Sequence, residues 1–146
     1  MIRRIRGGEV VVALGAASLV VSMFTPWYSS PVGNLDLWDT FGPAAALILA
    51  AICAGLAVIA AALAERDENP SLAVATAVWC TLLGLAGTIA AIVRVLERPD
   101  NAGSTCIGPW LGLAGTLAIL LGAWLVLRDE RPSLYRPARP QRRARP

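Results

Sequence analysis

Four long apolar segments, separated by short polar stretches, constrain this chain of 146 residues more than any other feature. A helix rises about 1.5 Å per residue, so ~20 apolar residues cross the ~30 Å hydrocarbon core of a bilayer. The segments lack the short alternating pattern of membrane barrel strands, and only a helix satisfies all of its own backbone groups in lipid. We therefore predict an all-α fold, a four-transmembrane-helix bundle in residues 1–127 with short loops and helices over about 8–27, 43–64, 72–96 and 109–127.

The composition excludes most soluble classes of protein. Hydrophobic residues make up 56% of the chain and charged residues 16%, with a mean hydropathy of +0.60. Soluble domains average about 45–50% apolar and about 25% charged residues. These values argue against a soluble enzyme domain and against a disordered regulator. The chain also contains no histidine, which excludes every site that needs an imidazole.

The distribution of arginine predicts the orientation in the membrane. All thirteen basic residues are arginines. If both termini are cytoplasmic, eleven arginines lie on the inner side and only Arg94 and Arg98 on the outer side. An excess of basic residues on cytoplasmic flanks is the usual determinant of topology, so we predict an N-in/C-in arrangement. We expect the first segment to be retained, because the sequence TPWY at 25–28 offers no small-residue cleavage site.

Residues 128–146 form a basic C-terminal tail. They include seven arginines, two acidic residues and several prolines, and they have too few apolar side chains to build a core. We therefore expect a disordered cytoplasmic tail. Juxtamembrane arginines attract anionic lipid by about 1 kcal/mol each, whereas nucleic-acid binding would need a folded reader or an aromatic platform. The expected partners are the bilayer and its anionic headgroups, not nucleic acid, with candidate contacts at Arg128, Arg131 and Arg136.

Six of the nine aromatic residues map to the predicted outer face. The outer loop at 25–42 is too short for a domain but long enough for a compact cap. Aromatic side chains often form an interfacial belt, and that interpretation accounts for most of them. The competing interpretation is a recognition surface at this face, with polar partners, formed by Trp27, Trp38, Trp110, Asp36, Asp39 and Arg94.

Arg94 is the one charge clearly inside an apolar segment. A charge within a membrane span is by default a pointer to function. Arg94 lies close to the end of its segment, however, so its long side chain can reach the interface. It can also pair with Glu97 one turn further on, or with Asp36 or Asp39 across the outer face. We expect a structural ion pair or a side chain that extends to the interface.

Proton-coupled transport has no evident proton carrier in this sequence. Glu9 precedes the first apolar run and follows Arg6 closely, so we expect it to be hydrated and ionised. No acidic residue lies at mid-depth in any of the four segments. Buried acidic residues at that depth are the usual proton relays of pumps and transporters, which makes this class the weaker alternative.

The sequence also predicts no catalytic activity, no bound cofactor and no metal site. The serines and threonines of the apolar segments have no histidine or lysine base beside them, and nucleophilic catalysis needs one. Asp36 and Asp39 are too few ligands for a firm Ca²⁺ site, which uses at least about six oxygens. The cysteines form neither a CxxC pair nor an even framework, which excludes a zinc knuckle and a disulfide scaffold; they are Cys53, Cys80 and Cys106.

Small residues recur at four-residue spacing in the apolar segments. This spacing lets two helices approach closely, and it predicts a tight bundle. It leaves open whether the contacts lie within one chain or between two copies. The positions are Gly15, Ala51 with Gly55, Gly84 with Thr88, Ala86 with Ala90, Gly108 with Gly112, and Ala118 with Gly122.

Three short motifs carry a resemblance to a known group. TPWY at 25–28 follows the first segment, LWDTF at 37–41 precedes the second, and GPWLG at 108–112 opens the fourth. Over about residues 7–130 the chain resembles small four-helix integral membrane proteins of unassigned function that are common in actinobacteria. The resemblance implies the four-helix topology and a bacterial plasma membrane, and it implies no activity or ligand.

These observations together favour a non-enzymatic membrane protein. We expect a structural or accessory role, exercised through partner proteins or through self-association as a homo-oligomer. A small oligomeric transporter or channel is the alternative. A membrane sensor that uses the aromatic outer cap is the weaker alternative.

Overall fold

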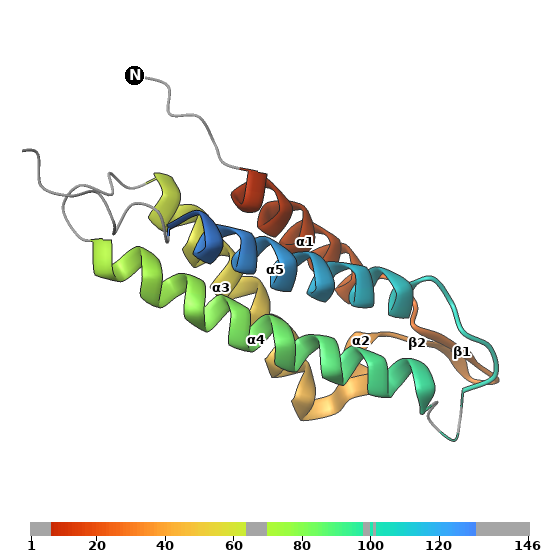
Figure 1. Ribbon diagram of the computed structural model, residues 1–146. Helices are drawn as coiled ribbons and strands as arrows, with labels where there is room; N and C mark the ends of the chain where they lie inside the picture. Colours follow the sequence, from red (N-terminus) through yellow and green to blue (C-terminus); the bar gives the residue numbers. More distant parts are fainter. Residues whose placement is uncertain (1–6, 64–69, 98–99, 101, 131–146) are drawn as a thin grey trace, which may run out of the picture.

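The computed structural model describes residues 7–63, 70–97, 100 and 102–130 of the chain. Its described part is dominated by four long helices, α1 (Gly7–Phe24), α3 (Ala45–Leu63), α4 (Pro70–Leu96) and α5 (Gly108–Glu130), as Figure 1 shows. All four are long and apolar enough to cross a membrane. The predicted all-α class and the four apolar helices are therefore confirmed.

The ends of the helices follow local stop and start signals. Helix α1 ends at Phe24, earlier than predicted, because Pro26 disfavours helical geometry at the residue before it. Helix α5 begins at Gly108 with Pro109 as its second residue, and proline suits the first turn, where its missing N–H is not needed. Helix α5 then continues through Arg128 to Glu130, three residues beyond the end predicted for this helix at about residue 127.

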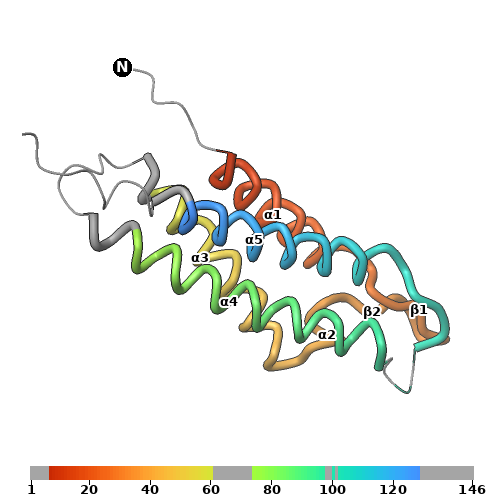
Figure 2. The backbone as a smooth tube through the Cα atoms, viewed as in Figure 1, coloured from red at the N-terminus to blue at the C-terminus, as the bar shows by residue number. Residues whose placement is uncertain are grey.

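The helices form an antiparallel bundle in which α5 lies between α1 and α4 (Figures 1 and 2). The packing of α1 against α5 is the most extensive in the molecule, followed by α4 against α5 and α3 against α4. The start of α1 and the end of α5 lie at the same end of the bundle (Figure 2). The short elements that follow α1 lie at the opposite end, where the candidate site is built.

Glycines bring the backbones of α1 and α5 into contact. Gly8 and Gly15 on α1, and Gly115 and Gly122 on α5, are spaced seven residues apart, which places each pair on one helix face. A Cβ added at Gly15 would lie 2.8 Å from the carbonyl oxygen of Gly115, and one at Gly122 would lie 2.8 Å from that of Gly8. No side chain fits between the helices at these points. The glycines therefore serve packing within one chain.

The other small residues also pack within the bundle. A Cβ added at Gly84 of α4 would meet the backbone of Leu120 at 3.2 Å, and one at Gly55 of α3 would meet Val12 of α1 at 3.3 Å. The Ser18 hydroxyl of α1 donates a hydrogen bond to the Leu111 carbonyl of α5, at 3.0 Å. Small residues thus set the distance between neighbouring helices of one chain.

The outward faces of the helices are apolar. Trp79 at the middle of α4 is 64% exposed, and Leu14 of α1 is 65% exposed. The interior is filled by fully buried side chains such as Val12, Leu19 and Ile119. A bundle that is apolar both inside and outside is typical of helices surrounded by lipid.

Candidate functional site

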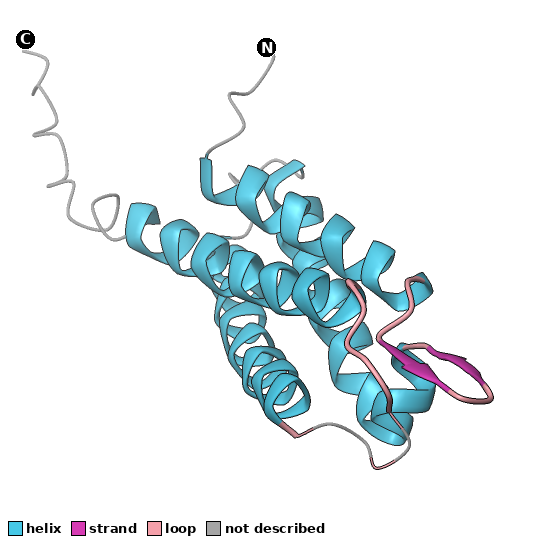
Figure 3. Ribbon diagram, turned by 90° about the vertical axis from the view of Figure 1, so that its right-hand side faces the viewer, coloured by secondary structure: helices cyan, strands magenta, loops and turns pink. Residues whose placement is uncertain are grey.

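The candidate site is a folded cap on one end of the bundle, which we define as residues 25–44 and 102–107. It contains an antiparallel hairpin of β1 (Tyr28–Ser30) and β2 (Gly33–Leu35), the short helix α2 (Leu37–Phe41) and the 3₁₀ turn η1 (Gly42–Ala44). Figure 3 shows the hairpin and α2 beside the loop that precedes α5. The cap predicted for the outer loop is thus a built structure with its own secondary elements.

Backbone hydrogen bonds tie the two parts of the cap together. The Ser29 N–H donates to the Ser104 carbonyl at 2.9 Å, and the Gly103 N–H donates to the Ser29 carbonyl at 2.7 Å. The Cys106 N–H donates to the Trp27 carbonyl at 2.9 Å. Residues 103–106 therefore lie along β1 as a third extended segment, and two loops that are distant in sequence form one platform.

Trp27 is the central packing residue of this cap. Its side chain is fully buried, and its indole N–H donates to the Ser22 carbonyl at 2.8 Å. Its ring meets Phe41 edge to face, with centroids 4.9 Å apart. A Cβ added at Gly112 would lie 2.7 Å from the indole, so the glycine makes room for the ring. Of the residues in the alternative recognition surface, Trp27 is therefore not accessible to a partner, because the chain folds back over the end of the bundle.

The six aromatic residues assigned to one face divide into two groups. Burial of an aromatic ring removes a large apolar area from water, and half of the rings are used in this way. The buried rings that form the core of the cap are Trp27, Tyr28 and Phe41. The rings that remain available to lipid or to a partner are Phe24 at 82% exposure, Trp38 at 46% and Trp110 at 59%.

Asp36 has a structural role in the local fold. It is the N-cap of α2, where its Oδ1 accepts a hydrogen bond from the Asp39 N–H at 3.0 Å. The Thr40 hydroxyl donates to the Asp36 carbonyl at 2.7 Å. Asp39 itself is exposed. An aspartate three residues before another acidic residue is a capping pattern that the sequence itself displays, and it is the signal for this role of Asp36.

Arg94 lies under the cap, in the last turn of α4. Its guanidinium carbon is 5.6 Å from the centroid of the Phe41 ring, a cation–π distance, and its carbonyl accepts a hydrogen bond from the Tyr28 hydroxyl. The side chain is half-buried. Its guanidinium forms no ion pair with Asp36, Asp39, Glu97 or any other acidic residue in the described part of the chain. The expected ion pair is therefore absent among these residues, and the contact with Phe41 takes its place.

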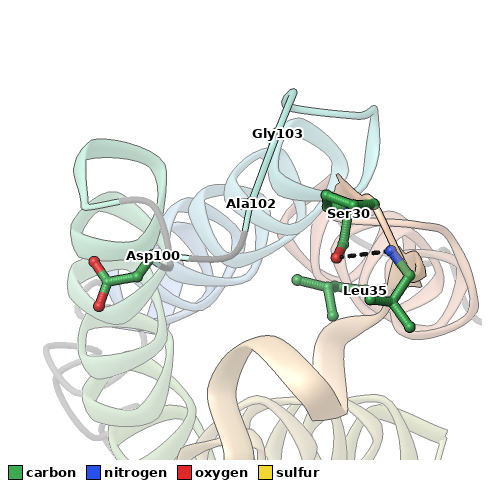
Figure 4. A pocket seen from close by; sticks show the side chains of 7 residues that line it. Ser30, Leu35, Asp100, Ala102 and Gly103 are labelled. Atoms are coloured by element: carbon green, nitrogen blue, oxygen red, sulfur yellow. Dashed lines mark hydrogen bonds between the residues drawn. The ribbon is translucent and has the colours of Figure 1, made fainter.

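A shallow cavity of about 610 Å³ opens beside the hairpin; its lining includes Ser30, Leu35 and Asp100 (Figure 4). The Ser30 hydroxyl accepts a hydrogen bond from the Val32 N–H at 3.4 Å. Figure 4 shows Asp100 beside the end of α4, with its carboxylate pointing away from Ser30. The carboxylate of Asp100 and the hydroxyl of Ser30, both from residues in this lining, do not converge on a common point, so they form no catalytic pair.

The opposite end of the bundle contains the other predicted contacts. Arg128 is exposed in the last turn of α5, with its guanidinium carbon 5.7 Å from the Trp124 ring centroid. Arg131 and Arg136 lie outside the described residues. Glu9 is only 6% exposed in the first turn of α1, so the expectation that it is hydrated is wrong. The neighbouring Gly8 packs closely against α5, since an added Cβ would lie 3.0 Å from the Gly122 carbonyl oxygen.

Neither metal ligation nor comparison with known proteins assigns a function to the described part of the chain. Within the described ranges no group of three or more histidine, cysteine, aspartate or glutamate side chains is arranged to hold a metal ion. The chain matches no protein-family model, and no curated protein or solved structure matches it. What the chain does must therefore be argued from the geometry of the cap and the bundle.

Proposed function

We propose that the chain is a non-enzymatic integral membrane protein of structural or accessory role, which acts by presenting the cap to a partner protein or to a second copy of itself. The proposal includes an N-in/C-in orientation in a bacterial plasma membrane, so that the cap lies on the outer face. The distribution of arginines supports this orientation, since eleven of thirteen then lie on the cytoplasmic side.

The observation that carries the proposal is that the cap is folded and yet exposes apolar side chains. Val32 at the tip of the hairpin is 98% exposed, and Ile107 beside the start of α5 is 60% exposed. Trp38 and Trp110 are also exposed, as described above. Tryptophan is enriched at the energetic centres of protein interfaces, and exposed apolar groups on an ordered frame bind without a large loss of conformational entropy.

The polar groups of the cap support binding rather than chemistry. The Asp36 carboxylate and the Thr40 hydroxyl hold α2, and the Ser29 and Ser104 hydroxyls bond to each other at 2.8 Å. These groups serve the fold of the platform. The surface that remains is a mixture of apolar tips and exposed carboxylates, the composition of a contact surface.

Photo-crosslinking in native membranes tests this proposal. A photoreactive amino acid is placed at Val32 on the cap or at Trp110 in the adjoining first turn of α5 and, as a matched control, at Leu14, which is 65% exposed on the side of α1. We expect a discrete crosslinked protein, either a partner or a dimer, from the cap positions and only lipid adducts from Leu14. Equal protein crosslinking at all three positions, or none at the cap, would refute the proposal.

A small oligomeric transporter is the second candidate, and one observation favours it. Glu9 is an acidic side chain buried in the first turn of an apolar helix, and such residues often mark ion pathways. The measurement is proton or drug flux in reconstituted vesicles. Flux by the unaltered chain that disappears in Glu9→Gln would support transport, whereas vesicles without flux would exclude it.

A further inference from the structure

The guanidinium of Arg94 lies over the Phe41 ring at the cap end of the bundle. It has no acidic partner among the residues that the structure describes. It has five N–H donors, and none of them has a hydrogen-bond acceptor among the described residues. The side chain is half-buried, so part of its hydration is lost. Donors that lose water without gaining an acceptor carry a free-energy cost. A ligand that accepts hydrogen bonds here would remove that cost.

The depth of Arg94 indicates where such a ligand comes from. Arg94 lies in the last turn of α4, and if the four helices span the membrane, as the proposed function states, this turn lies at the level of the lipid headgroups. On the same helix, Val93 is 43% exposed and Leu96 is 76% exposed. These exposed apolar side chains, on other faces of the same turn, are available to lipid acyl chains at this end of α4. The planar guanidinium fork matches a phosphate geometrically.

The surrounding charge indicates the class of headgroup. The predicted outer segments, 25–42 and 94–107, contain four acidic residues and two arginines, a net charge of −2. Asp39, Glu97 and Asp100 are all exposed. A ligand with a net negative charge would be repelled by this face. A phosphate that carries its own ammonium group complements both signs of charge.

We propose that Arg94, half-buried over Phe41 with no acidic partner among the described residues, binds the phosphate of a zwitterionic phospholipid headgroup such as phosphoethanolamine. The ammonium group of the lipid then faces the exposed carboxylates, of which Glu97 is one turn from Arg94 on α4. The acyl chains lie along the exposed apolar side of α4. The inference depends on the proposed membrane insertion but not on the proposed protein partner.

Native mass spectrometry of the full chain in detergent tests the inference. Phosphatidylethanolamine and phosphatidylglycerol with identical acyl chains are titrated separately, and the retained lipid is counted. We expect a preference for phosphatidylethanolamine, and we expect Arg94→Gln to weaken its binding by about tenfold or more. Arg94→Lys should give an intermediate loss because an ammonium cannot form the bidentate contact. The control is Gly7→Ala, where nothing lies within 4 Å of the added carbon, and it should leave phosphatidylethanolamine binding unchanged.

Two further measurements test the contact with the lipid ammonium group and distinguish a phospholipid from a soluble anion as the ligand. Glu97→Gln removes an exposed carboxylate and should narrow the preference for phosphatidylethanolamine over phosphatidylglycerol without changing the fold. Free O-phosphoethanolamine and inorganic phosphate should compete only at far higher concentrations than the lipid; competition at equal concentration would assign a soluble anion instead and overturn the inference.

The inference is overturned if folded Arg94→Gln retains phosphatidylethanolamine as well as the unaltered chain does, with the fold checked by the thermal midpoint in the same detergent. If that variant does not fold, an unchanged lipid preference in Glu97→Gln overturns it instead. Flotation of the chain with vesicles reports on the proposed function separately. A chain that does not float refutes membrane insertion itself, whereas a chain that floats but shows no dependence on Arg94 refutes only the lipid site.

Discussion

The contact between α1 and α5 makes the sharpest prediction about stability, at Gly15. A Cβ at this position would lie 2.8 Å from the carbonyl oxygen of Gly115 and 2.8 Å from the backbone nitrogen of Ile119. Both are backbone atoms, which cannot rotate away as a side-chain tip can. Gly15→Ala therefore forces the two helices apart.

Two opposing contributions determine the size of the effect. Overpacking a tight contact costs typically about 1–3 kcal/mol, and we expect the upper end here because the opposing atoms are backbone atoms. Alanine stabilises a helix interior by about 1 kcal/mol relative to glycine. The expected net loss in the free energy of unfolding is about 2 kcal/mol.

This loss is measured by equilibrium unfolding of the purified chain in mixed micelles with an increasing fraction of dodecyl sulfate. The circular dichroism of the helices reports the fraction unfolded. The matched control is Gly7→Ala in the same helix, where nothing lies within 4 Å of the added carbon. We expect that control to unfold at the same detergent fraction as the unaltered chain. If Gly15→Ala is as stable as Gly7→Ala, the backbone contact between α1 and α5 is not as described.

Three further predictions concern the cap. Trp27→Ala should lower the free energy of unfolding by about 3–5 kcal/mol in the same assay, because it empties the buried centre of the cap. Trp38→Ala truncates an exposed ring and should change the free energy of unfolding by less than about 0.5 kcal/mol. Equal losses in the two variants would contradict the assignment of Trp27 to the core of the cap. Asp36→Ala should cost about 1 kcal/mol and Asp36→Asn much less, since asparagine also caps a helix. A membrane-impermeant maleimide should label Cys106 in intact cells, and labelling only after lysis would reverse the proposed orientation.

The division of the aromatic residues into buried and exposed rings could not be predicted from the sequence. TPWY at 25–28 and LWDTF at 37–41 place all of their rings near one end of the helices, and composition cannot distinguish a ring in an interfacial belt from a ring in a core. Gly112 on α5 leaves space for the buried Trp27 indole, and Phe41 packs edge to face against that ring. Gly112 is distant from both rings in the sequence, and only the folded chain brings the three together.

The glycine contact between α1 and α5 has a partial signal in the sequence. The seven-residue spacing of Gly8 with Gly15, and of Gly115 with Gly122, is visible in the sequence. The spacing predicts one small-residue face on each helix. It does not say that the two faces meet each other, because a face of this kind serves equally well between two copies of a chain.

Hydropathy along the chain determined the four apolar helices and the positions of the polar connections. Both depend on the free energy of transferring each segment from water into an apolar environment, which is a local property of the sequence. The burial of Glu9, the pairing of Arg94 with Phe41 and the union of residues 25–44 with 102–107 were decided only by the tertiary structure. Each of them depends on which elements of the fold lie beside which. Those are properties of pairs of residues distant in the chain, which no local pattern contains.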